Sequence, residues 1–163
     1  MPIPEFVSRL RDYIGTELLW LPGVSAVVVD RDGRILLGRR ADNDRWAVIS
    51  GILEPGEQPA VAVAREVLEE TGVTVEVEGL AAVDTDQQVV VYPNGDRAQY
   101  LDLTFACRPV GGIAHVADDE STAVGWFAPD ALPEPLVESS RHRIVRALAY
   151  RAEPGRGAWF ARP

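Results

Sequence analysis

The segment from residue 51 to residue 73 constrains this chain more than any other. Gly51 is followed by Glu57, and the segment ends with the nine residues REVLEETGV at positions 65–73. Glu66, Glu69 and Glu70 are spaced i, i+3 and i+4, so on a helix they share one face. Like charges at this spacing repel. Since carboxylate oxygens suit Mg²⁺ or Mn²⁺, the segment predicts a hard-metal site built on a loop and a helix.

Local signals bound that helix on both sides. Residues 51–58 contain two glycines and a proline and predict a loop. Pro59 suits the first helical turn, where no N–H donor is needed. We expect the helix to run to about Thr71, with Gly72 as a left-handed C-terminal cap. The apolar face opposite the carboxylates is expected to pack on a sheet through Ala60, Val61, Ala64 and Leu68.

The rest of the chain predicts strands and two further helices. Apolar spacing over residues 4–19 predicts a one-sided helix broken near Gly15, followed by a turn at residues 20–23. A C-terminal helix is expected from a cap at Ser139 or Ser140 to Tyr150, with a loose tail at 153–163. Strands are expected at residues 24–29, a hairpin partner at 34–39, then 46–49, 73–83, 89–92, 97–107 and 125–127, with loops at 111–112 and 117–120. The pattern predicts one α/β domain spanning residues 1–163.

Composition excludes several classes of protein. The net charge of −9 argues against binding to nucleic-acid polymers. No apolar run reaches membrane-spanning length, and the N-terminus lacks the basic and apolar regions of a secretory signal. Cys107 is the only cysteine, so no internal disulfide can form, which fits a cytoplasmic protein. We expect it to be a buried structural thiol rather than a reactive one.

The same segment resembles the Nudix hydrolase family, whose signature is G-x5-E-x7-R-E-U-x-E-E-x-G-U, where U is aliphatic. Every fixed position matches, and Val67 and Val73 fill the aliphatic positions. The match covers only 23 residues. The family often has a second glycine where this chain has Ser50. The resemblance implies an α/β/α sandwich with a central mixed sheet.

The resemblance also implies a reaction. Nudix hydrolases cleave a nucleoside diphosphate linked to another moiety X, and divalent ions stabilise the charge that builds on the phosphoryl oxygens. By this likeness Glu69 and Glu70 are expected metal ligands, and the carbonyl of Gly51 is a further one. Glu66 is either a metal ligand or the base that orients water.

Two further positions follow from the resemblance. Arg65, which cannot lose its charge, is expected to pair with Glu57, lock the loop onto the helix and orient Glu66, rather than contact phosphate. In several family members a loop before a late Trp-containing strand supplies another ligand or base. Here Glu120 is the first candidate and Asp119 the second, with an ordinary polar loop as the alternative.

Substrate contacts are less constrained. Arg39, Arg40 and Arg45 lie just ahead of the segment, and one of them could hold a phosphate through two hydrogen bonds; the alternative is a role in surface solubility. Asp102 lies in an otherwise apolar strand, and it is either a base or ribose contact or a satisfied structural carboxylate.

We therefore expect a Mg²⁺- or Mn²⁺-dependent pyrophosphohydrolase acting on a nucleotide. An ordinary or oxidised nucleoside triphosphate is the leading substrate, with ADP-ribose or a nucleotide sugar as the alternative. A nucleotide-binding sensor domain without hydrolysis is the competing class. Apolar residues near both ends, including Phe6, Leu10, Ile14, Trp159 and Phe160, suggest a homodimer or termini that fold back on the domain.

Overall fold

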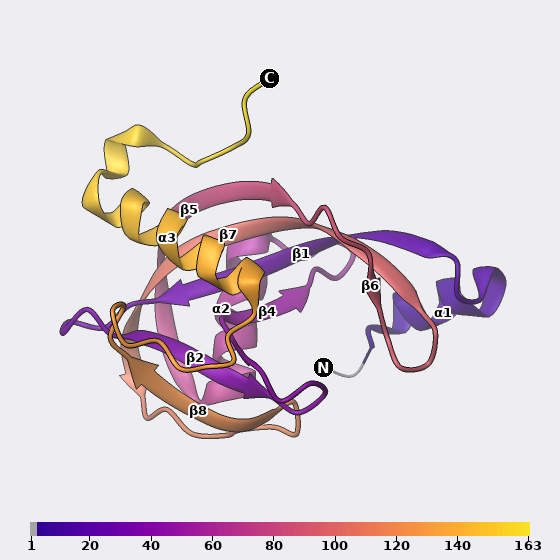
Figure 1. Ribbon diagram of the computed structural model, residues 1–163, viewed down its shortest axis with the longest axis horizontal. Coiled ribbons are helices and arrows are strands. Elements are labelled where there is room, and N and C mark those ends of the chain that lie inside the picture. The colour runs from indigo at the N-terminus through magenta and orange to yellow at the C-terminus, as the bar shows by residue number, and fades with distance from the viewer. Residues whose placement is uncertain (1–2) are drawn as a thin grey trace.

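A computed structural model describes residues 3–163 and arranges them as sheets between helices (Figure 1). In chain order the elements are α1 (Glu5–Ile14), β1 (Leu18–Val28), β2 (Ile35–Arg40), β3 (Trp46–Ala47), β4 (Ile49–Ile52), α2 (Pro59–Thr71), β5 (Val73–Thr85), β6 (Val90–Val91), β7 (Arg97–Gly112), β8 (Ser121–Phe127), α3 (Glu138–Ala152) and the short helix η1 (Pro154–Arg156).

The larger sheet has the strand order β4-β1-β7-β5, with β6 attached to β7. β1 and β7 are parallel, and the other neighbours in this sheet are antiparallel. A smaller sheet has the order β3-β2-β8. α2 and α3 contact β1, β5 and β7 of the larger sheet from opposite sides. The predicted α/β class and the mixed sheet between helical layers are confirmed.

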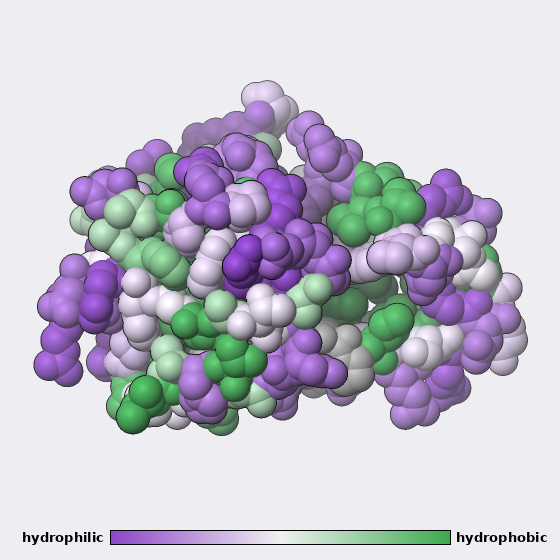
Figure 2. Space-filling view, turned by 60° about the horizontal axis from the view of Figure 1, so that its bottom comes forward, coloured by the Kyte–Doolittle hydropathy of each residue, from purple (hydrophilic) through white to green (hydrophobic). Residues whose placement is uncertain are grey.

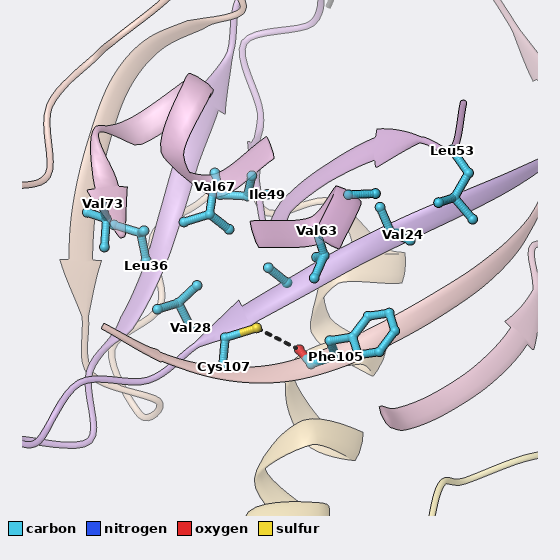
Figure 3. Close-up of a cluster of buried hydrophobic side chains, with 12 residues drawn as sticks. Val24, Val28, Leu36, Ile49, Leu53, Val63, Val67, Val73, Phe105 and Cys107 are labelled. Atoms are coloured by element: carbon cyan, nitrogen blue, oxygen red, sulfur yellow. Dashed lines mark hydrogen bonds between the residues drawn. The ribbon is translucent and has the colours of Figure 1, made fainter. Parts of the chain in front are cut away.

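The core follows from the two-sided burial of β1. Val24 and Val28 pack with α2, whereas Val27 packs with residues of α3, and all three are fully buried. A central strand that is covered on both faces needs such a continuous β-branched run. Figure 3 shows the α2-side cluster, in which the buried Cys107 thiol points to the carbonyl of Phe105. The predicted structural role of this cysteine is confirmed.

The N-terminal boundaries differ from the prediction. α1 ends at Ile14, where Gly15 adopts a positive φ of 59°, and residues 18–23 form a strand rather than a turn. The reason is long-range pairing: β1 matches β7 in parallel from Leu18 opposite Arg97 onward. The helical extension predicted at 1–19 is therefore shorter, and its residues 1 and 2 lie outside the described residues.

Two other connections differ as well. β2 is not a regular hairpin partner of β1: only Val29 bridges Ile35, after which β2 pairs with β3 and β8 in the other sheet. Residues 111–112, predicted as a loop, extend β7 opposite the start of β5.

The C-terminal region is more ordered than the prediction. α3 starts at Glu138 without a side-chain cap; Ser140 instead accepts a hydrogen bond from the Val48 amide at 3.2 Å. The tail is not loose, because Trp159 forms a parallel bridge with Ala82 of β5. The guanidinium of Arg146 also lies 3.5 Å from the centre of the Trp159 ring.

α1 packs back on its own domain. Val7 is buried against Leu21 and Ala98, and Phe6 packs beside them, whereas Leu10 remains 41% exposed. Figure 2 shows one face, on which hydrophobic residues form separate patches among hydrophilic ones. The homodimer therefore stays a prediction. Within residues 3–163, no helix combines the length and apolar character that crossing a membrane requires.

Candidate active site

Helix α2 has the predicted bounds but presents a different face to the interior. It runs from Pro59 to Thr71, and Gly72 takes the left-handed conformation with φ 69°. Val61 and Leu68, expected to face the sheet, are 62% and 48% exposed. The sheet contacts are made instead by Ala62, Val63 and Val67, and this places Glu66 and Glu70 on the buried side.

Arg65 organises the carboxylates at the start of the helix. Its Nε and Nη2 donate to the two carboxylate oxygens of Glu57 at 2.9 and 3.0 Å, so the predicted pairing of loop and helix is present. The same hydrogen bonds hold the pKa of Glu57 below its usual value. Nη1 donates to Glu69 at 2.9 Å and lies 3.1 Å from Glu66 Oε1. One guanidinium therefore contacts three carboxylates.

Glu66 and Glu70 have unsatisfied oxygens. Their exposed fractions are only 2% and 7%, and among residues 3–163 the Oε1 atom of each has no hydrogen-bond partner. Glu66 Oε1 forms an ion pair with Arg65 Nη1 at 3.1 Å, so its charge is partly compensated. Burial without a hydrogen-bond partner is costly for a carboxylate.

Burial changes the acidity of both groups. It raises the pKa of Glu66 to about 7, against the lowering effect of Arg65. It raises the pKa of Glu70 to about 8, with further contributions from the charges of Glu66 and Asp118. Two buried oxygens without a hydrogen-bond partner, on acids whose pKa is raised, suit a divalent cation, which would coordinate them and neutralise their charge.

The site is not a closed metal cage. Within residues 3–163, no three acidic, histidine or cysteine side chains converge as a complete set of ligands. One reason is that the predicted ligand Glu69 is turned to Arg65. Gly51 lies in β4 opposite Val24, rather than in the predicted loop, and its carbonyl stays a predicted ligand.

A cavity of about 500 Å³ joins these groups to the acidic loop before β8. It is lined by Pro4, Ile52, Glu54, Glu57, Arg65, Glu66, Glu69, Asp118 and Glu120. Glu120 lines this cavity, and its role as a ligand or base stays a prediction. The second acid of the loop in this lining is Asp118, not Asp119, and burial raises the pKa of Asp118. The motif contains no signal for Asp118. Another cavity of about 510 Å³, between residues 29–34 and 108–112, shares no lining residue with this one.

The three candidate phosphate-binding arginines already have partners. Arg39 pairs with Asp44 at 2.7 Å, and Arg40 forms two hydrogen bonds with Asp42 at 2.9 and 2.6 Å. Arg45 donates to the backbone carbonyl of Leu136 at 3.0 Å. None of the three lines the cavity.

Of these three arginines, Arg40 is the one whose pKa shift includes a contribution from a site residue. Its hydrogen bond to Asp42 is the main influence that raises its pKa, and the charge of Glu70 makes a small further contribution. Phosphate contact by any of the three arginines stays a prediction.

Asp102 has the contacts of a structural carboxylate. It is 4% exposed and accepts hydrogen bonds from the hydroxyls of Ser25 and Thr104 at 2.6 and 2.7 Å. Arg143 of α3 lies 3.2 Å from its second oxygen. These contacts favour the structural alternative over a base or ribose contact, and Asp102 does not line the cavity.

The geometry agrees with comparisons to known proteins. The model of the NUDIX domain matches residues 19–148 of this chain. The chain belongs to the NUDIX family. A "MutT-like protein" of Streptomyces ambofaciens is 44% identical over 125 residues, covering 77% of this chain and 75% of that protein.

Other relatives of this NUDIX chain carry different names. An RNA pyrophosphohydrolase of Caulobacter vibrioides is 37% identical over 136 residues, with 74% of this chain and 78% of that protein covered. The 8-oxo-dGDP phosphatase NUDT18 of Mus musculus is 31% identical over 139 residues, covering 82% of this chain but only 38% of that protein.

A solved structure of a UDP-X diphosphatase has a TM-score of 0.68 and 28% identity, covering 96% of this chain and 74% of that one. The chain is thus an enzyme of the Nudix pyrophosphohydrolase family, within which the relatives differ in substrate.

Proposed function

We propose that this protein is a Mg²⁺- or Mn²⁺-dependent pyrophosphohydrolase that acts on a nucleoside triphosphate, ordinary or oxidised. The observation that carries the proposal is a pair of buried oxygens, Oε1 of Glu66 and of Glu70, that have no hydrogen-bond partner among residues 3–163. Glu66 lines a cavity together with Asp118 and Glu120. The cavity volume of about 500 Å³ falls within the range of small-molecule sites. The single thiol and the acidic charge support a cytoplasmic location and a small substrate rather than a polymer.

Different groups would have different roles. Glu66, Glu69 and Glu120, which line the cavity, and Glu70 and the carbonyl of Gly51, which do not, are the groups that would hold the cation. The bound ion supplies charge neutralisation at the phosphoryl oxygens and makes water more acidic. Glu66 is either one of these ligands or the base that orients water. In the protein without metal, burial raises its pKa to about 7, which suits proton acceptance near neutral pH.

Arg65 and Glu57 position these groups. The two hydrogen bonds between them join the loop at residues 53–58 to the helix. The remaining nitrogen of the guanidinium, Nη1, holds the carboxylate of Glu69, which is partly exposed. On metal binding, Glu69 would leave Arg65 and bind the cation instead. Arg65 therefore orients the carboxylates through its hydrogen bonds and takes no direct part in bond making or breaking.

The decisive experiment is turnover with and without metal. A panel of nucleoside triphosphates, 8-oxo-dGTP, ADP-ribose and a UDP-sugar should be scored for released phosphate, pyrophosphate and nucleoside monophosphate. We expect EDTA to abolish turnover and Glu69→Gln to lower kcat by about a hundredfold or more, because one ligand worth about 2.7 kcal/mol is lost. Glu76→Gln, on the exposed part of β5, is the matched control. Undiminished turnover in excess chelator would refute the proposal.

Two alternatives have distinct outcomes in the same panel. Cleavage of only ADP-ribose or a UDP-sugar would assign the enzyme to the second substrate class, which the similarity to a UDP-X diphosphatase structure favours. A ligand-induced rise in melting temperature without product after long incubation would indicate a nucleotide sensor. A 5′-triphosphorylated RNA belongs in the panel, because one relative is named as an RNA pyrophosphohydrolase.

A further inference from the structure

The segment at residues 113–120 connects β7 to β8 and carries two of the acids that line the cavity, Asp118 and Glu120. Its backbone is bound to the C-terminal end of α2. The amide of His115 donates to the carbonyl of Thr71 at 3.0 Å, and the amide of Ala117 donates to the carbonyl of Glu70 at 3.2 Å. The last carbonyls of a helix have no partner within the helix, so the segment caps α2 while it brings its own carboxylates to the site.

His115 adds a side-chain contact at the same place. Its ring lies so close to Gly72 that a Cβ atom built there would stand 2.1 Å from His115 Cε1. The ring is oriented by Nδ1, which donates to the carbonyl of Ile113 at 2.8 Å. Gly72 is therefore required for two separate reasons: its positive φ of 69° and the imidazole packed on its α-carbon.

The far end of the segment is bound too. The carbonyl of Glu120 accepts from the amide of Ala41 at 2.7 Å, and the carboxylate of Asp118 accepts from the amide of Glu120 at 3.0 Å. The position of the two acids therefore depends on both attachments, and Asp118 lies next to the one on α2. Two side chains of the segment pack at this place: Ala114 contacts the core cluster that contains Val67, and the ring of His115 lies on Gly72.

We propose that His115 is a positioning residue: its ring, packed on Gly72, sets where Asp118 and Glu120 stand relative to Glu66 and Glu70. The residue thereby controls the affinity of the cavity for a divalent cation. This inference rests on the proposed function, because it takes the divalent cation as the ligand. His115 itself does not line the cavity, so it acts through the acids rather than as a ligand.

The exposure of His115 makes it suitable for substitution, since no core packing is lost. Three variants separate its contacts. His115→Ala removes ring and hydrogen bond, His115→Phe keeps a flat ring without the hydrogen bond, and His115→Asn keeps a donor near Nδ1. His142→Ala is the matched control, because His142 is an exposed histidine on α3 whose nearest acid is Glu138.

The first measurement is Mn²⁺ binding by electron paramagnetic resonance without nucleotide. We expect His115→Ala to raise the Mn²⁺ dissociation constant about tenfold, as is common when a group that orients metal ligands is removed. His115→Asn and His115→Phe should each recover part of the loss, and His142→Ala should bind as the wild type does. Equal affinity in His115→Ala and His142→Ala would overturn the inference.

A second measurement separates this inference from the proposed function. Hydrogen exchange of the Ala117 amide needs neither metal nor substrate, and we expect it to be faster in His115→Ala. Gly72→Ala should lower the melting temperature of the wild type. It should lower the melting temperature of the His115→Ala variant by less, because the new methyl group no longer clashes with the ring. If the wild type binds Mn²⁺ while exchange and melting show no such coupling, only the positioning role fails. If the wild type binds no Mn²⁺, both proposals fail.

Discussion

Replacing Glu70 by glutamine should stabilise the protein in the absence of metal. Burial, Glu66 and Asp118 raise the pKa of Glu70 from 4.5 to about 8. An unfolded glutamate ionises near pH 4.5, whereas the folded one keeps its proton, so the unfolded chain binds fewer protons between these values. The free energy of unfolding therefore falls as the pH rises from about 4.5 to about 8, and Glu70→Gln removes this loss.

The magnitude follows from the shift. One pKa unit corresponds to about 1.4 kcal/mol, so the rise to about 8 sets an upper bound of about 4–5 kcal/mol. A buried glutamine amide keeps its own desolvation cost of about 1–3 kcal/mol, which leaves a net gain of about 2 kcal/mol at pH 8. For a chain of this size such a gain raises the melting temperature by roughly 4–8 °C.

The assay is thermal unfolding followed by circular dichroism in EDTA between pH 5.5 and 8.5. The advantage of Glu70→Gln should be small at pH 5.5, where Glu70 of the wild type is mostly neutral, and should level off at its largest value from about pH 8 upward. Glu69→Gln is the control, because its half-exposed carboxylate already pairs with Arg65 and no gain is expected. With saturating Mg²⁺ the order should reverse, since only the wild type keeps the full set of ligands. A Glu70→Gln variant that melts below the wild type at pH 8 in EDTA would refute the reasoning.

Three further predictions concern other contacts. Arg65→Lys keeps the charge but loses the two-pronged contact with Glu57, so kcat/KM should fall by about tenfold or more; unchanged kinetics would contradict the positioning role. Burial raises the pKa of Cys107 to about 12, so Ellman's reagent at pH 8 should label the thiol only after unfolding in guanidinium, and rapid labelling of the native protein would be inconsistent with this. Trp159→Ala removes the contact with Arg146 and should cost about 1 kcal/mol, measured as a loss of roughly 2–4 °C in melting temperature; an unaltered melt would show that the tail contributes nothing.

Local signals were sufficient to predict helix α2. Pro59 at the first turn and Gly72 at the left-handed cap act within a few residues, and both ends agree with the structure. The resemblance to the Nudix family predicted that Arg65 would pair with Glu57 and that Glu120 would belong to the site; the pairing is present, and Glu120 lines the cavity.

The burial of the carboxylates could not be read from the same spacing. Charged residues normally face water. The local sequence of α2 therefore favours an orientation in which Glu66 and Glu70 face solvent and Val61 and Leu68 face the sheet. The opposite orientation is set by the packing of Ala62, Val63 and Val67 on strands that are distant in sequence. Tertiary contacts of this kind leave no trace in local periodicity.

The same limit explains the errors at the chain ends. Residues 20–23 contain Pro22 and Gly23, which favour a turn locally, but parallel pairing with β7 keeps them extended. Ser140 is a good helix cap by type, yet its hydroxyl is taken by the Val48 amide of a remote segment. In each case a partner far along the chain overrides the local preference.

The backbone pairing of Trp159 with β5 has a consequence for solubility. β5 is the outermost strand of the larger sheet, and an open strand edge offers unpaired backbone groups to other molecules. The Trp159 amide donates to the carbonyl of Ala81, and its carbonyl accepts from the amide of Val83, both at 2.8 Å. The tail thus occupies part of the edge with backbone of the same chain. A protein shortened before this residue would expose that edge, and we would expect it to aggregate by adding strands between molecules.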